Sequence, residues 1–212
     1  MNDLIAELER VRRSVASETT PDGRVYVVEL RRTYDGPAVD LWDACTNPDR
    51  IPRWFLPISG DLRLGGRFQL EGNAGGEITE CEPPRRLAVT WEFGGDVSLV
   101  TLDLAPAGDD TTELLLRHAV GDNDHWATYG PGATGVGWDL VLLGLVLYLR
   151  TGSSVDDPEA FGTSPEGRAF MQRSAADWGA AHAAAGAPAA IADEAAARTS
   201  VFYAPDPESA PS

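Results

Sequence analysis

Hydrophobic side chains near the N-terminus recur every three or four residues, a spacing typical of an amphipathic helix. The pattern predicts a helix over residues 2–18, and Pro21-Asp22-Gly23 ends it with a turn. The apolar positions are Leu4, Ile5, Leu8, Val11 and Val15.

After this turn the pattern changes to alternation of apolar and polar residues, which is typical of strands. Two short helices interrupt the alternation, one between Pro37 and Pro48 and one over 49–55. Turns rich in Gly and Pro separate the remaining segments, so the pattern predicts an antiparallel meander with one apolar face. The expected strands are 24–34, 61–64, 67–71, 77–82, 86–93, 97–104 and 111–120.

A long helix is expected after Pro131-Gly132, because apolar residues continue there at helical spacing to Leu149. It is apolar nearly all round, so it is the natural cover for the apolar face of the sheet. Gly135, Gly137 and Gly144 are small positions on this helix where another element can approach closely.

The remainder of the chain is rich in alanine, the strongest helix former. We expect a helical extension over 151–204, split by Gly186-Ala187-Pro188, and a frayed segment over 205–212. The predicted organisation is therefore a helix over 1–20, a core domain over 23–150, and these two C-terminal segments. The extension either packs on the core or forms a homodimer contact through Phe161, Phe170, Trp178, Phe202 and Tyr203.

Charge narrows the classes of partner. The chain has 33 Asp and Glu against 17 Lys and Arg, a net charge of −16, which disfavours nucleic acid and anionic lipid surfaces. The apolar run over 140–149 is too short to span a bilayer, and residues 1–13 lack the apolar core of a signal peptide. Cys45 and Cys81 cannot make a disulfide framework. These features predict an acidic, soluble, cytoplasmic protein with no membrane insertion.

The central segment resembles the family of homologues of the activator of the heat-shock protein 90 ATPase, part of the START-like or SRPBCC superfamily. The resemblance covers roughly residues 25–150, in the order that the family shows. The stretches that carry it are 39–48, Arg53-Trp54-Phe55 with Pro57, Gly65-Gly66-Arg67-Phe68, 82–87 with Thr90-Trp91, His118, and 130–138 leading into Leu143.

This resemblance implies an α+β helix-grip (START-like) fold, in which a curved antiparallel sheet surrounds a long C-terminal helix; the helical tail is an addition to it. Such folds usually leave a hydrophobic cavity between sheet and helix. Three functions follow as alternatives: a module that binds a lipid-, polyketide- or aromatic-like molecule, an enzyme of the polyketide cyclase or dehydratase type, and an interaction protein with a chaperone partner. Fold alone does not choose among them.

The candidate ligand-binding residues are mostly aromatic, and each of them also suits a plain aromatic core. His118 is either a hydrogen-bonded core histidine or a polar anchor and general base, and no second catalytic group is evident. No metal site and no cofactor is expected, because Asp122, Asp124 and His125 indicate a solvated loop. The predicted lining comprises Trp54, Phe68, Trp91, His118, Trp126, Tyr129, Trp138 and Leu142.

Three further charged positions have structural interpretations. Arg53 and Arg67 are expected to form exposed ion pairs with Glu77, Glu80 or Glu92. Asp139 lies near the start of the long helix, where a carboxylate interacts favourably with the helix dipole.

Overall fold

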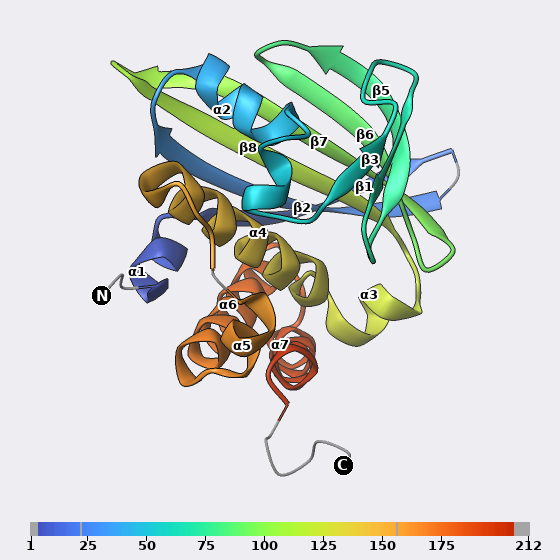
Figure 1. The fold of residues 1–212 in the computed structure, drawn as a ribbon. Coiled ribbons are helices and arrows are strands. Elements are labelled where there is room, and N and C mark those ends of the chain that lie inside the picture. The colour runs from blue at the N-terminus through green and yellow to red at the C-terminus, as the bar shows by residue number, and fades with distance from the viewer. Residues whose placement is uncertain (1–3, 22, 156, 206–212) are drawn as a thin grey trace. The chain divides into compact units, whose positions relative to one another are not determined.

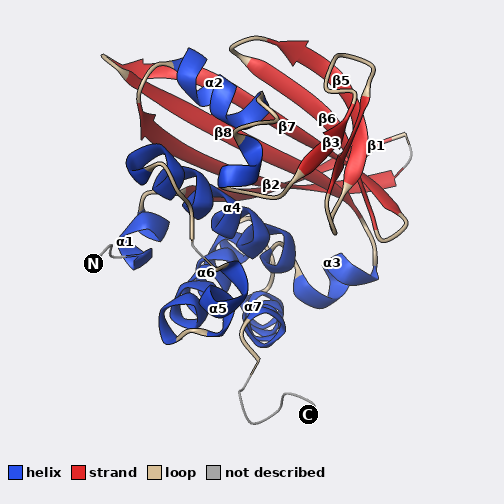
Figure 2. Ribbon diagram, viewed as in Figure 1, coloured by secondary structure: helices blue, strands red, loops and turns tan. Residues whose placement is uncertain are grey.

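The strands form one sheet with the order β1-β2-β8-β7-β6-β5-β4-β3, shown in a computed structural model that describes residues 4–21, 23–155 and 157–205 (Figure 1, Figure 2). From β3 to β8 every neighbouring pair is antiparallel, as the Gly- and Pro-rich turns predicted. The strands are β1 (Arg12–Thr20), β2 (Gly23–Asp35), β3 (Ile58–Gly60), β4 (Arg67–Leu70), β5 (Gly75–Glu82), β6 (Arg86–Phe93), β7 (Asp96–Gly108) and β8 (Thr111–Gly121).

The helices fall before, within and after this sheet in sequence. The long apolar helix is present as predicted, and so are the split helices of the extension, so the α+β helix-grip class is confirmed. The helices are α1 (Leu4–Glu9), α2 (Ala38–Thr46), η1 (Ile51–Arg53), α3 (Asp124–Tyr129), α4 (Gly132–Thr151), α5 (Pro158–Thr163), α6 (Pro165–Ala184) and α7 (Ala189–Tyr203).

The chain divides into two compact units. The first unit comprises Met1–Val28, Gly121–Leu143 and Val155–Ser212, and the second comprises Glu29–Val120 and Gly144–Ser154. Strand β2 and helix α4 each contribute residues to both units. The domain boundaries expected from the sequence stay predictions.

In the second unit the predicted alternation sets the buried face of the sheet. Val89 of β6 lies opposite Val100 of β7, which lies opposite His118 of β8. Two residues further on, Leu102 lies opposite Leu116. All five side chains are buried, so one face of these strands carries the core of this unit.

The N-terminal helix is shorter than the sequence predicted. Helix α1 ends at Glu9, and the expected helical residues from Arg12 onward form strand β1 instead. The apolar spacing fits a helix, but Val15 and Thr19 are β-branched, and pairing in a sheet overrides a weak helical pattern.

Two smaller expectations were also wrong. The strand expected over 61–64 lies at Ile58–Gly60, and the chain from Arg63 to Gly66 instead forms a turn in which the Gly66 N–H donates to the Arg63 carbonyl at 2.8 Å. The helix expected over 49–55 is only the three-residue turn η1.

The C-terminal extension packs inside the first unit. Helices α6 and α7 lie side by side (Figure 1). The α6 side chains Phe170 and Trp178 are almost completely buried. The ring of Trp178 lies against Gly135 of α4, where a Cβ atom would stand 2.1 Å from Cε2 of the ring. The predicted close approach at Gly135 is therefore confirmed. The frayed segment expected from 205 lies outside the described residues from 206 onward.

Helix α4 is long and apolar enough to cross a membrane by length and composition, and it alone among the helices of the described residues meets that test. However, 67% of its most apolar window is buried within the protein. Burial of this kind is what the core helix of a soluble protein shows.

Candidate functional site

Three predicted lining residues meet on the buried face of the sheet in the second unit. Phe68 comes from β4, Trp91 from β6 and His118 from β8. The ring centroids of Phe68 and Trp91 are 6.3 Å apart, and those of Trp91 and His118 are 6.0 Å apart in an edge-on arrangement. Phe68 and His118 are buried, whereas Trp91 is half-buried. Strands separated by up to 50 residues thus bring an aromatic pair beside one imidazole, which we call the Trp91 cluster.

His118 is tied into this cluster by a hydroxyl that the sequence analysis missed. Its Nε2 atom lies 2.8 Å from Oγ of Ser98, and that hydroxyl lies 3.1 Å from the carbonyl oxygen of Trp91. Ser98 stands directly opposite Trp91 across the β6–β7 pair, and His118 is one diagonal step away on β8. A serine beside Val97 and Leu99 in a strand pattern gives no sign of this role, because the signal is the register and not the residue type.

The protonation of this chain of contacts follows from its geometry. The Trp91 carbonyl can only accept, so the single Ser98 proton serves that contact, and Nε2–H of His118 then donates to Oγ. Burial lowers the pKa of His118 to about 4, so the imidazole is neutral at pH 7. The Trp91 cluster therefore contains polar groups without a net charge.

Trp54 belongs to a separate part of the second unit. Its indole Nε1 donates to the carbonyl of Ala44 at 3.0 Å, and its ring stacks near Phe55. Its own carbonyl oxygen lies so close to Gly144 that a Cβ atom there would stand 2.4 Å away, which confirms the second close approach expected on α4. These contacts position α4 against the segment after α2.

Trp126 and Tyr129 lie in the first unit on α3, in a region where the sequence predicted only a loop. Asn123 caps the helix by accepting from the backbone N–H of Trp126 at 2.9 Å, a local signal that was overlooked. The Trp126 ring stacks on Tyr26 with centroids 4.1 Å apart and planes 6° from parallel. Tyr129 contacts Phe202 of α7 at 5.3 Å.

The remaining predicted lining residues, Trp138 and Leu142, are buried on the part of α4 that belongs to the first unit.

Arg32 is a further buried polar residue that the sequence analysis missed. It is 3% exposed, and its guanidinium carbon lies 5.3 Å from the ring centroid of Tyr34. Both residues point to the same side of β2 as Leu30, so the strand period places an arginine among apolar positions.

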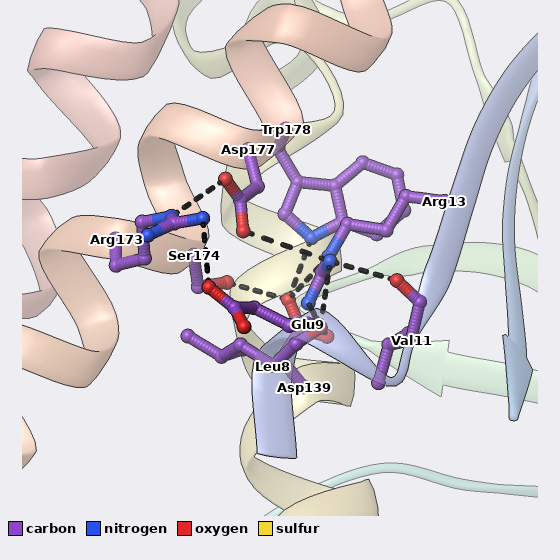
Figure 3. Close-up of polar contacts among 9 residues, drawn as sticks. All are labelled: Leu8, Glu9, Val11, Arg13, Asp139, Arg173, Ser174, Asp177 and Trp178. Atoms are coloured by element: carbon purple, nitrogen blue, oxygen red, sulfur yellow. Dashed lines mark hydrogen bonds and ion pairs between the residues drawn. The ribbon is translucent and has the colours of Figure 1, made fainter. Parts of the chain in front are cut away.

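Asp139 has a different role from the one expected (Figure 3). It lies in the second turn of α4, fully buried, and not at the helix start. Arg13 of β1 donates to it from Nε and Nη2 at 3.1 and 2.9 Å, and Ser174 and Trp178 of α6 donate to its Oδ2 at 2.5 and 3.0 Å. The dipole interpretation was wrong, because Asp139 joins three segments of the first unit through this buried Asp139 cluster.

Other side chains that could react or bind a metal show weaker signs of a functional role. Burial raises the pKa of the Cys45 thiol to about 12, so the thiol stays protonated and unreactive. Within the described residues, no group of three or more His, Cys, Asp or Glu side chains could hold a metal ion. Arg67 pairs with Glu92 at 2.5 Å, one of the exposed ion pairs expected from the sequence.

The sequence matches the family described as "Activator of Hsp90 ATPase homolog 1-like protein" over residues 35–150. The crystal structure of CalU16 from Micromonospora echinospora is 37% identical, with a TM-score of 0.67 over 81% of this chain and 97% of that one. The solution structure of CalU16 gives 36% identity, a TM-score of 0.71, and coverage of 82% and 96%.

A third solved structure is DynU16, described as a putative protein in the dynemicin biosynthetic locus. It is 24% identical, with a TM-score of 0.52 over 60% of this chain and 48% of that one, so it supports the fold alone. No match was found among the curated proteins.

The sheet, the long helix and the family match together define a START-like protein of the helix-grip class. The chain belongs to the family of Activator of Hsp90 ATPase homolog 1-like proteins.

Proposed function

We propose that the protein binds a hydrophobic small molecule, lipid-, polyketide- or aromatic-like, and that the Trp91 cluster is part of its binding site. The observation that carries the proposal is the half-buried ring of Trp91 between buried Phe68 and neutral His118. Small-molecule sites are mostly apolar and contain a few polar groups that fix orientation. The other predicted lining residues are further candidates for this binding site. We also propose that the protein is cytoplasmic.

Native mass spectrometry of the purified protein tests for a retained ligand directly. A titration with the apolar dye 8-anilinonaphthalene-1-sulfonate then compares Trp91→Ala with Glu113→Ala. Removing the indole takes away the apolar area of one aromatic side chain, so we expect binding to weaken roughly tenfold or more. Glu113 lies on the other face of β8, paired with Arg31, and its replacement should leave binding unchanged. Equal effects of the two substitutions would refute the proposal.

A second candidate function uses the same cluster for catalysis. The buried, neutral imidazole of His118 is the observation that favours it: with Nε2–H donated to Ser98 Oγ at 2.8 Å, the other ring nitrogen, Nδ1, carries the lone pair that a general base needs. The expected substrate is the same polyketide-like molecule, cyclised or dehydrated. Substrate turnover that His118→Gln abolishes, with dye binding retained, would favour this enzyme over a simple binding module.

The family name also suggests a chaperone partner, and the acidic surface is suited to a basic docking site. Stimulation of the chaperone ATPase by the purified protein would support this third candidate. Its absence would leave the binding module and the enzyme.

A further inference from the structure

The two ends of the sheet differ in how much strand they expose. Strand β3 at one end has three residues, whereas β1 at the other end has nine, Arg12–Thr20. Long edge strands invite pairing with another chain, and proteins usually shorten them, interrupt them with proline or cover them. Strand β1 contains no proline, and its residues Ala16 to Thr19 are all exposed.

The beginning of β1 is less accessible to a partner strand. Arg13 points into the first unit, where its side chain is 7% exposed and bonded to Asp139. Arg12, Ser14, Ala16 and Glu18 lie on the opposite, exposed side of the strand. Any partner strand therefore meets one positive and one negative side chain on this side, six residues apart.

This spacing selects one way for β1 to pair with itself. In an antiparallel pair centred on Val15, Arg12 of one chain stands directly opposite Glu18 of the other, and the two-fold axis repeats the contact. A register centred on Ser14 or Ala16 places neither charge opposite its counterpart. A register shifted by a half step would set Glu18 across from Arg13, but these two side chains point to opposite faces of the strand, so a symmetric antiparallel pair cannot adopt it.

We infer that a second copy of this chain docks along the free edge of β1, in antiparallel register about Val15, so that two sheets join into one. Val15, Thr19 and Thr20 suit such a strand, since β-branched residues favour pleated structure. Arg12 and Glu18 each have a polar contact within their own chain, and the contact between chains adds to it. This dimer differs from the one expected through the C-terminal extension.

Sedimentation velocity of the full chain tests the inference. We expect a concentration-dependent species of twice 22.7 kDa. Arg12→Glu and Glu18→Arg should each raise the dimer dissociation constant by about tenfold or more, because two attractions across the pair become repulsions. The double variant Arg12→Glu/Glu18→Arg should restore the affinity of the unmodified chain.

Arg85→Glu is the matched control, because it reverses the charge of an exposed arginine, paired with Glu82, far from β1 in sequence. It should leave the dimer unchanged. A protein that stays monomeric at every concentration overturns the inference. A dimer that survives both single substitutions also overturns it and places the contact elsewhere, such as in the C-terminal extension. Dye binding should be unaffected throughout, so failure here is distinguishable from failure of the proposed function.

Discussion

Each compact unit buries a polar side chain among apolar neighbours, and the two units do so differently. In the first unit Asp139 receives four hydrogen bonds, two of them from the Arg13 guanidinium. In the second unit His118 contacts the single hydroxyl of Ser98. Asp139 thus has a cation beside it, whereas His118 is itself neutral and is bonded to a neutral hydroxyl.

The difference reflects the free energy of burying charge. A carboxylate without a compensating cation is too costly to bury, so the Asp139 cluster collects donors from β1 and α6. Burial raises the pKa of Asp139, and the contacts of Arg13, Ser174 and Trp178 reduce that rise without cancelling it. An imidazole avoids the same cost by staying neutral, and a neutral group can later exchange one hydrogen bond for a ligand. The first arrangement suits a structural anchor and the second suits a binding site.

The largest expected effect comes from removing the anchor. Asp139→Ala leaves the nearly buried Arg13 guanidinium without its main counter-charge, and we expect a loss of about 3–5 kcal/mol in the free energy of unfolding. Urea denaturation followed by far-ultraviolet circular dichroism measures it. Glu194→Ala removes an exposed ion pair with Arg198 and should cost about 0.5 kcal/mol at most. A loss no larger than this control would contradict the role of the Asp139 cluster.

The next effect is a pH dependence of stability that arises in the second unit. The pKa of His118 is lowered from 6.5 to about 4, so the unfolded chain takes up this proton at higher pH than the folded one. The contribution of neutral His118 is complete above pH 6.5 and is lost as the pH falls toward 4, by about 3 kcal/mol in total.

Chemical denaturation of the wild-type protein and of His118→Gln at several pH values measures this contribution as a difference. Carboxylates titrate in the same range in both proteins, so only the histidine should separate the two curves. Parallel curves between pH 6.5 and 4 would show that His118 is accessible to solvent and is not neutral in the way described.

The smallest effects concern the two glycines of α4, one in each unit. Gly135→Ala would bring a Cβ atom against the buried ring of Trp178, and Gly144→Ala would bring one against the backbone carbonyl of Trp54. We expect each to lower the melting temperature, at a cost of about 1–3 kcal/mol. Gly121→Ala is the control, because nothing lies within 4 Å of its Cβ position. An unchanged melting temperature for Gly135→Ala would mean that α6 does not pack tightly on α4.

Periodicity predicted the meander, the long helix and the split extension, because each rests on a repeated pattern of side chains along one segment. Periodicity failed where only a few residues determine the secondary structure, at β1 and at the turn that replaces the strand expected over 61–64. The Trp91 cluster was predicted in part, since Phe68, Trp91 and His118 all stood out as residue types. Ser98 and the true role of Asp139 were not predicted, because His118 lies 20 residues from Ser98 and Arg13 lies 126 residues from Asp139, and only the folded chain brings them together.

One carboxylate joins strand β1 to helix α6, since Arg13 and Ser174 bond to the same Asp139. Strand β1 and helix α6, which both lie outside the residues 35–150 that match the family, are therefore coupled through one side chain. A homologue that has lost one of them should have lost the other as well, with an apolar residue in place of the acid. In the same way, trimming either terminus in the laboratory should loosen the opposite one.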